Sequence, residues 1–434
     1  MEFLTGLNVI IFLYDAVAFY RKPDSIYLFL KLCFSFIIGV GVLFLQVMVA
    51  TVGYKFEVRD LEVIQQLFLL GYLALVSGAW VTSKAAGLMM PSTRRAPQFA
   101  QGPSARGSKL TQSGLHALAL ASLFSVAAYV ALNGLSFGQG SYEDRYKDAQ
   151  GMGILLRLFP AFLPYAAYRL VVAKDRSEFI RVAAVAMLFT GFMYIALEGY
   201  RQILIAALLI TLVIALKRRF LPAPLVAVTA LLALPGVIGL SFLRYIGESS
   251  AVTFQDPIVA AFYYTQGDLF PIDAPLRTFW WCSARECPGW GPFLNHFTHL
   301  IPRAIWPEKP DIQFDAAGYY TQVIIGYYRN VTLSSTIFSE AIMIGGYWAV
   351  PMFMFVSGVL AKLFSIWADR ATGIMRFILL SNVYIGFFWI REGLENGLLR
   401  IIFAVIFLLI ALLLAPLVAT LPSRTVGHAR FKGA

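Results

Sequence analysis

The sequence predicts an all-α polytopic membrane protein with about eleven transmembrane helices. Hydrophobic residues make up 59% of the 434 residues and charged residues only 14%, whereas a soluble domain has about 25% charged residues. Long apolar runs recur from end to end, and the loops between them alternate in charge. These features exclude an ordinary soluble enzyme, a disordered chain and a protein with a single membrane anchor.

A helix needs roughly 20 mostly apolar residues to cross a bilayer. We predict spans at 3–19, 26–52, 63–83, 113–133, 151–173, 182–198, 202–216, 222–243, 337–358, 375–390 and 397–420. The first run carries Glu2 and no basic N-terminal region, so we expect a retained helix rather than a signal peptide. The chain thus divides into eight spans within 1–243, a long segment at 244–336, and three spans with a tail within 337–434.

Basic residues gather in alternate loops, at 20–25, 84–112, 174–181, 217–221, 359–374 and 421–434. Because cytoplasmic loops collect Lys and Arg, we place these loops in the cytoplasm, the N-terminus outside and the C-terminus in the cytoplasm. The same loops explain the net charge of +11, so we expect a bilayer and no nucleic acid as partner. The Pro-, Gly- and Ser-rich stretch within 84–112 indicates a flexible basic linker beside anionic lipid.

The segment 244–336 is rich in aromatic residues, Pro and Gly. Loops of this length are usually functional or disordered, and the aromatic content argues against disorder. We expect a periplasmic lid of short helices near the membrane interface, where Trp and Tyr prefer to lie. Aromatic rings also stack on sugars, although interfacial anchoring alone would explain any single ring.

Cys282 and Cys287 lie five residues apart in this segment. In an oxidising periplasm they would form a small disulfide loop, and two free thiols are the alternative. Inside the predicted spans, Asp15 is an isolated charge that either pairs with a neighbour or faces a cavity.

Ionisable residues at the mouths of spans are candidate functional groups, because charge is costly in a membrane. Glu198 and Arg201 lie in the turn between the sixth and seventh spans, and Arg391 and Glu395 lie in the turn between the tenth and eleventh. Arg400 follows one to two helical turns further inward. Glu340 begins the ninth span.

In the long segment, His296, His299 and Arg303 would share one face of a helix. Two His three residues apart suggest zinc, but no third ligand has a suitable spacing, so we expect no metal site. The two His are better explained as hydrogen-bonding or acid–base groups.

Three arginines at different outer mouths, Arg201, Arg303 and Arg391, have the chemistry to bind one anion. A guanidinium group grips phosphate bidentately and keeps its charge, and a lipid-linked diphosphate is such an anion. The alternative pairs each arginine with a neighbouring acid: Glu198, Glu308, and Glu392 or Glu395.

Three short motifs resemble the bacterial oligosaccharide repeat-unit polymerases of the Wzy type, which assemble O-antigen or capsule. They are Gly199-Tyr-Arg-Gln202, the IPRAIWPEKP stretch at 301–310, and Ile337-Phe-Ser-Glu340 followed by Gly345-Gly346. The resemblance implies a GT-C-like glycosyltransferase at the periplasmic face of the inner membrane, which needs no metal, cofactor or nucleotide sugar. Its substrates would be undecaprenyl-diphosphate-linked oligosaccharides, and a chain-length regulator and a flippase would be its partners.

In this interpretation the growing glycan leaves its lipid diphosphate and joins the non-reducing end of an incoming unit. The expected diphosphate-binding residues are Arg201, Arg303, Arg391 and Lys309. The candidates for the base that activates the acceptor hydroxyl are Glu198, Glu340, His299 and Glu395. The expected sugar-binding residues are Tyr200, Trp306 and His296.

Two alternatives stay open at this point. An O-antigen ligase uses the same donor, and His296 or His299 would suit its large outer loop. A lipid-linked oligosaccharide flippase or other transporter would be expected to show internal repeats, and we find none. The absence of a G-x-x-x-x-G-K-[ST] motif further argues against an ATP-driven pump.

Overall fold

The computed structural model confirms the predicted fold class. It describes residues 2–52, 58–89, 109–134, 153–196, 201–222, 225, 270–301, 306–308, 315–326 and 333–420. Within these ranges every regular element is helical, and no strand occurs. Seven helices are long and apolar enough to cross a bilayer, or eight when a helix pair bent by 43° counts as one broken span.

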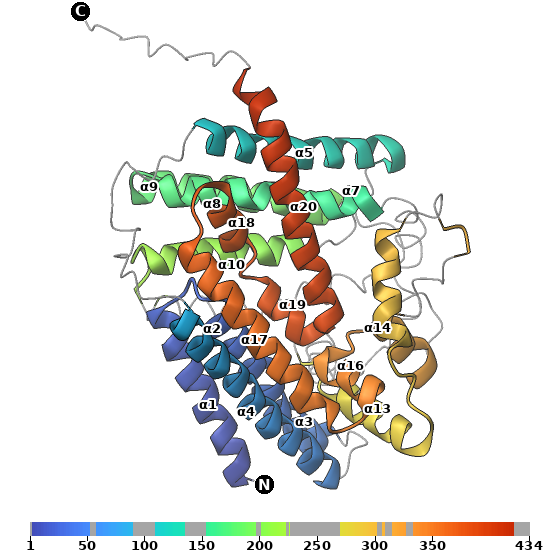
Figure 1. Cartoon of the computed structure of the whole chain (residues 1–434). Helices are drawn as coiled ribbons and strands as arrows, with labels where there is room; N and C mark the ends of the chain where they lie inside the picture. Colours follow the sequence, from blue (N-terminus) through green and yellow to red (C-terminus); the bar gives the residue numbers. More distant parts are fainter. Residues whose placement is uncertain are drawn as a thin grey trace, which may run out of the picture.

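One group of helices is built from the N-terminal part of the chain and one later helix (Figure 1). Its members are α1 (Glu2–Arg21), α2 (Ile26–Phe34), α3 (Gly41–Val52), α4 (Val58–Met89) and α17 (Ala349–Arg370). A π-helical turn at Ser35–Val40 joins α2 to α3, so both belong to one span. The carbonyl oxygen of Gly39 in this turn accepts a hydrogen bond from the Asn8 side chain at 3.1 Å.

Helices α4 and α17 pack closely through two glycines. A methyl group on Gly358 would lie 2.1 Å from the carbonyl oxygen of Leu75, and one on Gly78 would lie 2.2 Å from that of Phe355. Membrane helices gain little from burial of apolar surface against each other, so close backbone approach at small residues supplies their packing energy.

Polar side chains inside this group satisfy one another. Asp15 forms an ion pair with Lys31 at 2.7 Å and accepts a hydrogen bond from the Tyr72 hydroxyl at 3.0 Å. Asn8 and Gln65 exchange two hydrogen bonds of 2.7 Å. Asp15 is therefore a member of a buried pair that joins α1 to α2, which is one of the two roles considered for it.

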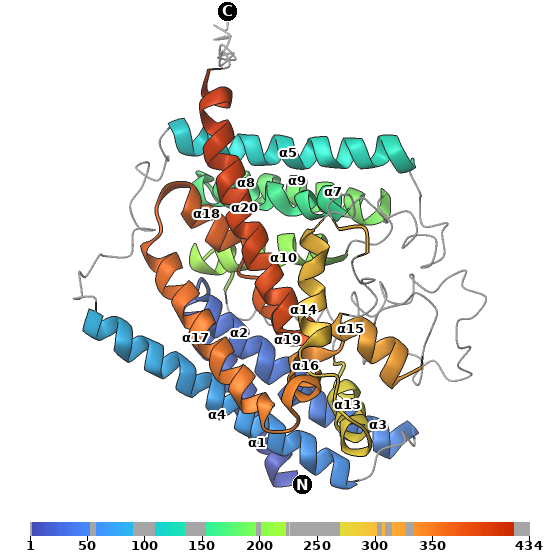
Figure 2. The same ribbon diagram turned by 45° about the vertical axis from the view of Figure 1, so that its right-hand side comes forward.

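A second group contains helices from the middle of the chain, and α20 crosses from this group to the first (Figures 1 and 2). Its members are α5 (Lys109–Asn133), α7 (Gly153–Leu158), α8 (Leu163–Val172), α9 (Arg176–Ala196), α10 (Arg201–Lys217) and α18 (Gly373–Ser381). Helix α20 (Leu394–Ala419) packs along α5, while α19 (Ile385–Glu392) packs on α2. The turn between α19 and α20 therefore lies where the two groups meet.

Contacts between distant segments support the predicted sidedness of the loops. Lys22 forms an ion pair with Asp369 at 2.7 Å, and Lys217 forms one with Asp24. These residues come from three of the loops that were predicted to be cytoplasmic. The ion pairs thus bring residues of these three segments together, while the side of the membrane on which they lie stays a prediction.

The predicted span at 337–358 is wrong. Helix α16 (Thr336–Gly345) ends at Gly346, which has a φ of 70° that favours glycine, and α17 begins only at Ala349. The spanning helix is α17 itself, so it also replaces most of the predicted loop at 359–374. The sequence concealed this break because the apolar composition continues through it.

The other differences concern shorter segments. Residues 202–216 form the apolar but shorter α10, and 375–390 form the bent pair α18 and α19. The predicted span at 3–19 is helical, as part of α1, but α1 is not one of the seven helices that are long and apolar enough to cross a bilayer. The predicted span at 222–243 lies outside the described residues, except for residue 225.

The described part of 244–336 consists of short helices. They are α13 (Asp273–Ala284), α14 (Gly291–His296) with a 3-10 turn at Phe297–Leu300, and α15 (Ala316–Tyr319) with a π-helical turn at Tyr320–Ile324. Cys282, in the last turn of α13, forms a disulfide with Cys287, which follows the helix. This loop packs on α16, because both sulfur atoms approach the carbonyl oxygen of Ile342.

Substitution of Gly358 by Ala should destabilise the protein, because the added methyl group would collide with the backbone of α4. Overpacking of this kind costs about 1–3 kcal/mol, and we expect a lower Tm for the purified protein in detergent. Gly87→Ala is the control, since Gly87 lies on the partner helix α4 and has open space around it. Equal Tm values for Gly358→Ala and Gly87→Ala would contradict the close packing of α4 on α17.

Candidate functional site

The centre of the candidate site is the N-terminus of α20, which is capped by a carboxylate from another helix. Glu340 of α16 accepts hydrogen bonds from the backbone N–H groups of Leu394 at 2.5 Å and Glu395 at 3.1 Å. The first N–H groups of a helix have no partner within the helix, and the helix dipole favours an anion there. Glu340 therefore fixes the start of α20 against α16.

Gly393 makes this contact possible. Its φ of 114° lies in the region that favours glycine, and a Cβ atom at this position would lie 2.4 Å from a carboxylate oxygen of Glu340. Any side chain here would displace the Glu340 carboxylate. The glycine thus determines both the direction of the turn between α19 and α20 and the approach of the cap.

Burial and hydrogen bonding have opposite effects on the pKa of Glu340. Burial raises the pKa of Glu340 to about 8, while the two backbone N–H groups act in the opposite direction and the charge of Asp315 adds to the increase. Because the backbone of α20 already uses both oxygens, a helix cap explains Glu340 better than the predicted role as a base.

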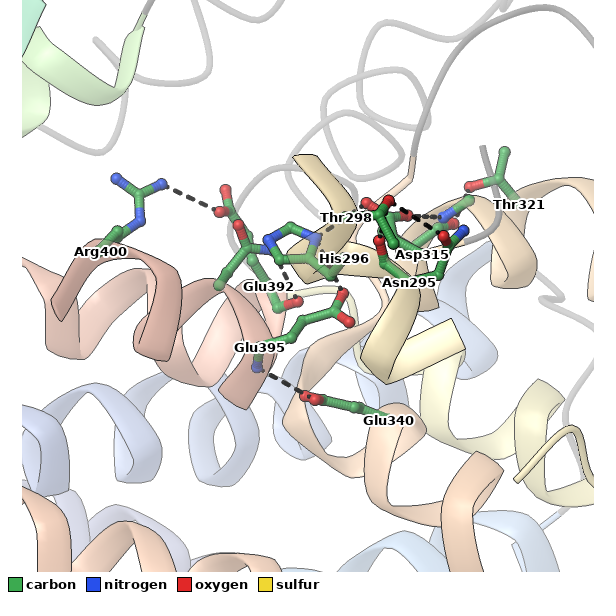
Figure 3. A network of polar contacts seen from close by, with 12 residues as sticks. Asn295, His296, Thr298, Asp315, Thr321, Glu340, Glu392, Glu395 and Arg400 are labelled. Carbon is green, nitrogen blue, oxygen red and sulfur yellow. Dashed lines mark hydrogen bonds and ion pairs between the residues drawn. The ribbon is translucent and has the colours of Figure 1, made fainter. Parts of the chain in front are cut away.

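A second buried carboxylate, that of Glu395, lies in the first turn of α20. The Glu395 side chain is fully buried, and Oε1 lies 3.7 Å from Nδ1 of His296 on α14. The same Nδ1 lies 3.2 Å from Oδ2 of Asp315. Asp315 in turn caps α15, because its Oδ1 accepts the N–H of Gly318 at 2.7 Å. Two acids and an imidazole from three separate elements therefore meet in one cluster (Figure 3).

On the other side of Gly393 the charge is mainly positive. Glu392 accepts hydrogen bonds from Arg391 at 3.1 Å and Arg400 at 3.3 Å. Gln202 of α10 connects the pair, since it donates to Glu392 at 3.1 Å and accepts from Arg400 at 2.7 Å. Two arginines share one carboxylate in a site where all three side chains are only 10–13% exposed. The cluster therefore has a surplus of positive charge, and the aromatic ring of Phe388 supports Arg400 at 4.3 Å.

The structure brings together some of the predicted site residues. Glu340, Glu395 and His296 meet at the start of α20, and Arg391 lies in the adjacent turn. Arg201 begins α10 next to Gln202, and His299 lies in the 3-10 turn after α14. For these two residues the structure describes the backbone and not the side chain. Trp306 is 40% exposed. Glu198, Tyr200, Arg303 and Lys309 lie outside the described residues.

Sequence reasoning missed the residues that connect the candidates. Asp315 precedes a short helix in a position typical of an N-cap, but nothing in the sequence links it to Glu395. Gln202 and Glu392 are 190 residues apart. Arg400 was noted at the mouth of the last span, but it was not assigned to the diphosphate.

Helices long and apolar enough to span a membrane, around a buried and strongly charged junction, define a polytopic membrane protein. A family model described as WzyE protein, O-antigen assembly polymerase, matches residues 3–431. The chain belongs to this family of O-antigen repeat-unit polymerases, which confirms the predicted resemblance and supports a location in the inner membrane. No solved structure matches the chain.

Substitution of Glu340 by Ala should destabilise the protein, because it leaves two buried N–H groups of α20 without their acceptor. Loss of a helix cap costs about 1–2 kcal/mol, so the Tm of the purified protein should fall. Glu286→Ala is the control, because Glu286 is an exposed acid next to Cys287. A Tm unchanged by Glu340→Ala would show that the cap contributes nothing to the fold.

Proposed function

We propose that the protein extends O-antigen at the periplasmic face of the inner membrane. In this proposal it transfers the growing glycan from undecaprenyl diphosphate to the non-reducing end of an incoming lipid-linked unit. The single observation that carries the proposal, beyond membership of the family, is the cluster of Arg391 and Arg400 around one carboxylate, Glu392. This cluster would bind the diphosphate of the donor.

The chemistry requires positive charge at the leaving group. When the bond between sugar and diphosphate breaks, negative charge grows on the phosphate oxygens. Guanidinium groups that are already in position stabilise this charge more in the transition state than in the ground state. In the proposed mechanism the arginines, and not a metal ion, hold the diphosphate.

Gln202 brings the start of α10 to the same place. The neighbouring Arg201 is the third arginine of the proposed diphosphate site, and Arg303 and Lys309 would add to it from the long segment. Trp306 and Tyr200 are proposed to bind the sugars, as the sequence analysis expected. His299 is kept as a candidate base.

The acceptor sugar must lose a proton when its hydroxyl attacks. The cluster of His296, Asp315 and Glu395 contains groups that accept protons. We propose this cluster as the acceptor side of the reaction. Glu198 stays a candidate for the same role.

The fold proposed for this activity is of the GT-C kind, with the long segment 244–336 as the periplasmic lid. A chain-length regulator and a flippase are expected as partners from the family alone. The family match favours a polymerase over an O-antigen ligase or a transporter.

Incubation of the purified protein with one lipid-linked repeat unit should give a ladder of products on a gel. A ladder requires repeated transfer onto lipid-linked acceptors, which is the activity of a polymerase. A single product formed only when a lipid A-type acceptor is added would indicate a ligase instead. Movement of the substrate across vesicles without any new bond would indicate a transporter.

Arg400→Ala should lower the rate of polymerisation by about 10²–10³-fold, the usual effect of removing one preorganised donor. Arg400→Lys should restore little of this rate, because Lys lacks the planar fork that grips phosphate. The initial rate of ladder formation measures both effects, and Arg181→Ala, at an exposed arginine of α9, is the control. Wild-type rates for both Arg400 variants would contradict the diphosphate site.

A further inference from the structure

Three side chains with metal-ligand chemistry meet between α14, α15 and α20. One ligand atom from each of His296, Asp315 and Glu395 lies within 4.8 Å of the other two. Nδ1 of His296 is 3.2 Å from Asp315 and 3.7 Å from Glu395. Ligands bound at about 2.1 Å to one tetrahedral ion lie about 3.4 Å apart, which is close to both His296 distances, and Figure 3 shows the three side chains together.

The burial and the weak hydrogen bonding of the Glu395 carboxylate point to a ligand. Its side chain is 0% exposed, and neither of its carboxylate oxygens accepts a hydrogen bond of normal geometry from the described residues. Its nearest favourable neighbours are the imidazole of His296 and the backbone N–H of Ala316. Buried charged groups are normally paired or bound to metal, and these long contacts satisfy the Glu395 carboxylate only weakly.

The charge around Glu395 indicates what that partner is. The charged groups that act most strongly on it are two further carboxylates, those of Glu340 and Asp315. A protonated His296 would offset only one of these negative charges. A divalent cation would offset two, in a site of low dielectric constant where such attraction is strong.

We propose that His296, Asp315 and Glu395 bind one divalent transition-metal ion of the kind represented by Mn²⁺ and Zn²⁺. Imidazole nitrogen together with carboxylate oxygen suits these ions. The site is partly preorganised, because the N–H of Gly318 holds Asp315 through the oxygen that does not face His296. This proposal replaces the expectation of a protein without metal.

The binding of the ion is independent of the proposed sugar transfer. One consequence rests on that function, because a metal ion lowers the pKa of a coordinated hydroxyl group. A cation at this place would assist the loss of the proton from the acceptor sugar.

The test is a titration of the full-length protein, purified in detergent and stripped with a chelator, with Mn²⁺ as the probe. Free Mn²⁺ is followed by its electron paramagnetic resonance signal, which broadens on binding. We expect about one ion per chain, displaced by Zn²⁺. Glu395→Gln and His296→Ala should each weaken binding at least tenfold, since even partners beyond the ligands contribute about 10–100-fold to metal affinity.

Glu286→Gln is the matched control, since it removes an exposed acid from the same long segment, and its binding should equal that of wild type. Gel filtration and circular dichroism select variants that are folded. Wild-type protein that binds no stoichiometric Mn²⁺ would overturn the proposal, as would folded Glu395→Gln and His296→Ala proteins that bind it as tightly as wild type. Because no glycan is present, the outcome does not depend on whether the protein polymerises O-antigen.

Discussion

The arrangement of the site depends on one interaction, the capping of α20 by the carboxylate of Glu340. A helix N-terminus that is buried among other helices has no water to satisfy its N–H groups. Glu340 supplies the acceptors from α16, and Gly393 leaves room for it. The cap therefore determines where the last span begins, and every charged residue of the site is placed relative to that point.

Around this cap the protein separates opposite charges over a few residues of chain. Glu392 precedes Gly393 and lies among arginines, whereas Glu395 follows it and lies among acids. Glu392 and Glu395 therefore have different charged neighbours. The proposed sugar transfer would use both environments, because negative charge leaves with the diphosphate and a proton leaves the acceptor hydroxyl.

The helices around the site are held by contacts that suit a membrane. The glycines of α4 and α17 bring two backbones together, and Asp15 and Lys31 neutralise each other between α1 and α2. Neither contact involves the candidate site. They make the first group of helices a firm support for α16 and α19, and through them for the turn that holds the arginines.

The sequence by itself determined the helical membrane class, most of the spans and the family, because these follow from composition, from the period of apolar runs and from short motifs. It also identified Glu340, Glu395, His296 and Arg391 as unusual, since ionisable residues at the mouths of spans are costly. Only the tertiary structure shows which groups each of them contacts. Glu340 became a cap because α20 starts beside it, and Asp315 joined His296 and Glu395 although 80 residues separate Asp315 from Glu395. A sequence records the spacing of ligands along the chain, whereas chemistry depends on their distance in space.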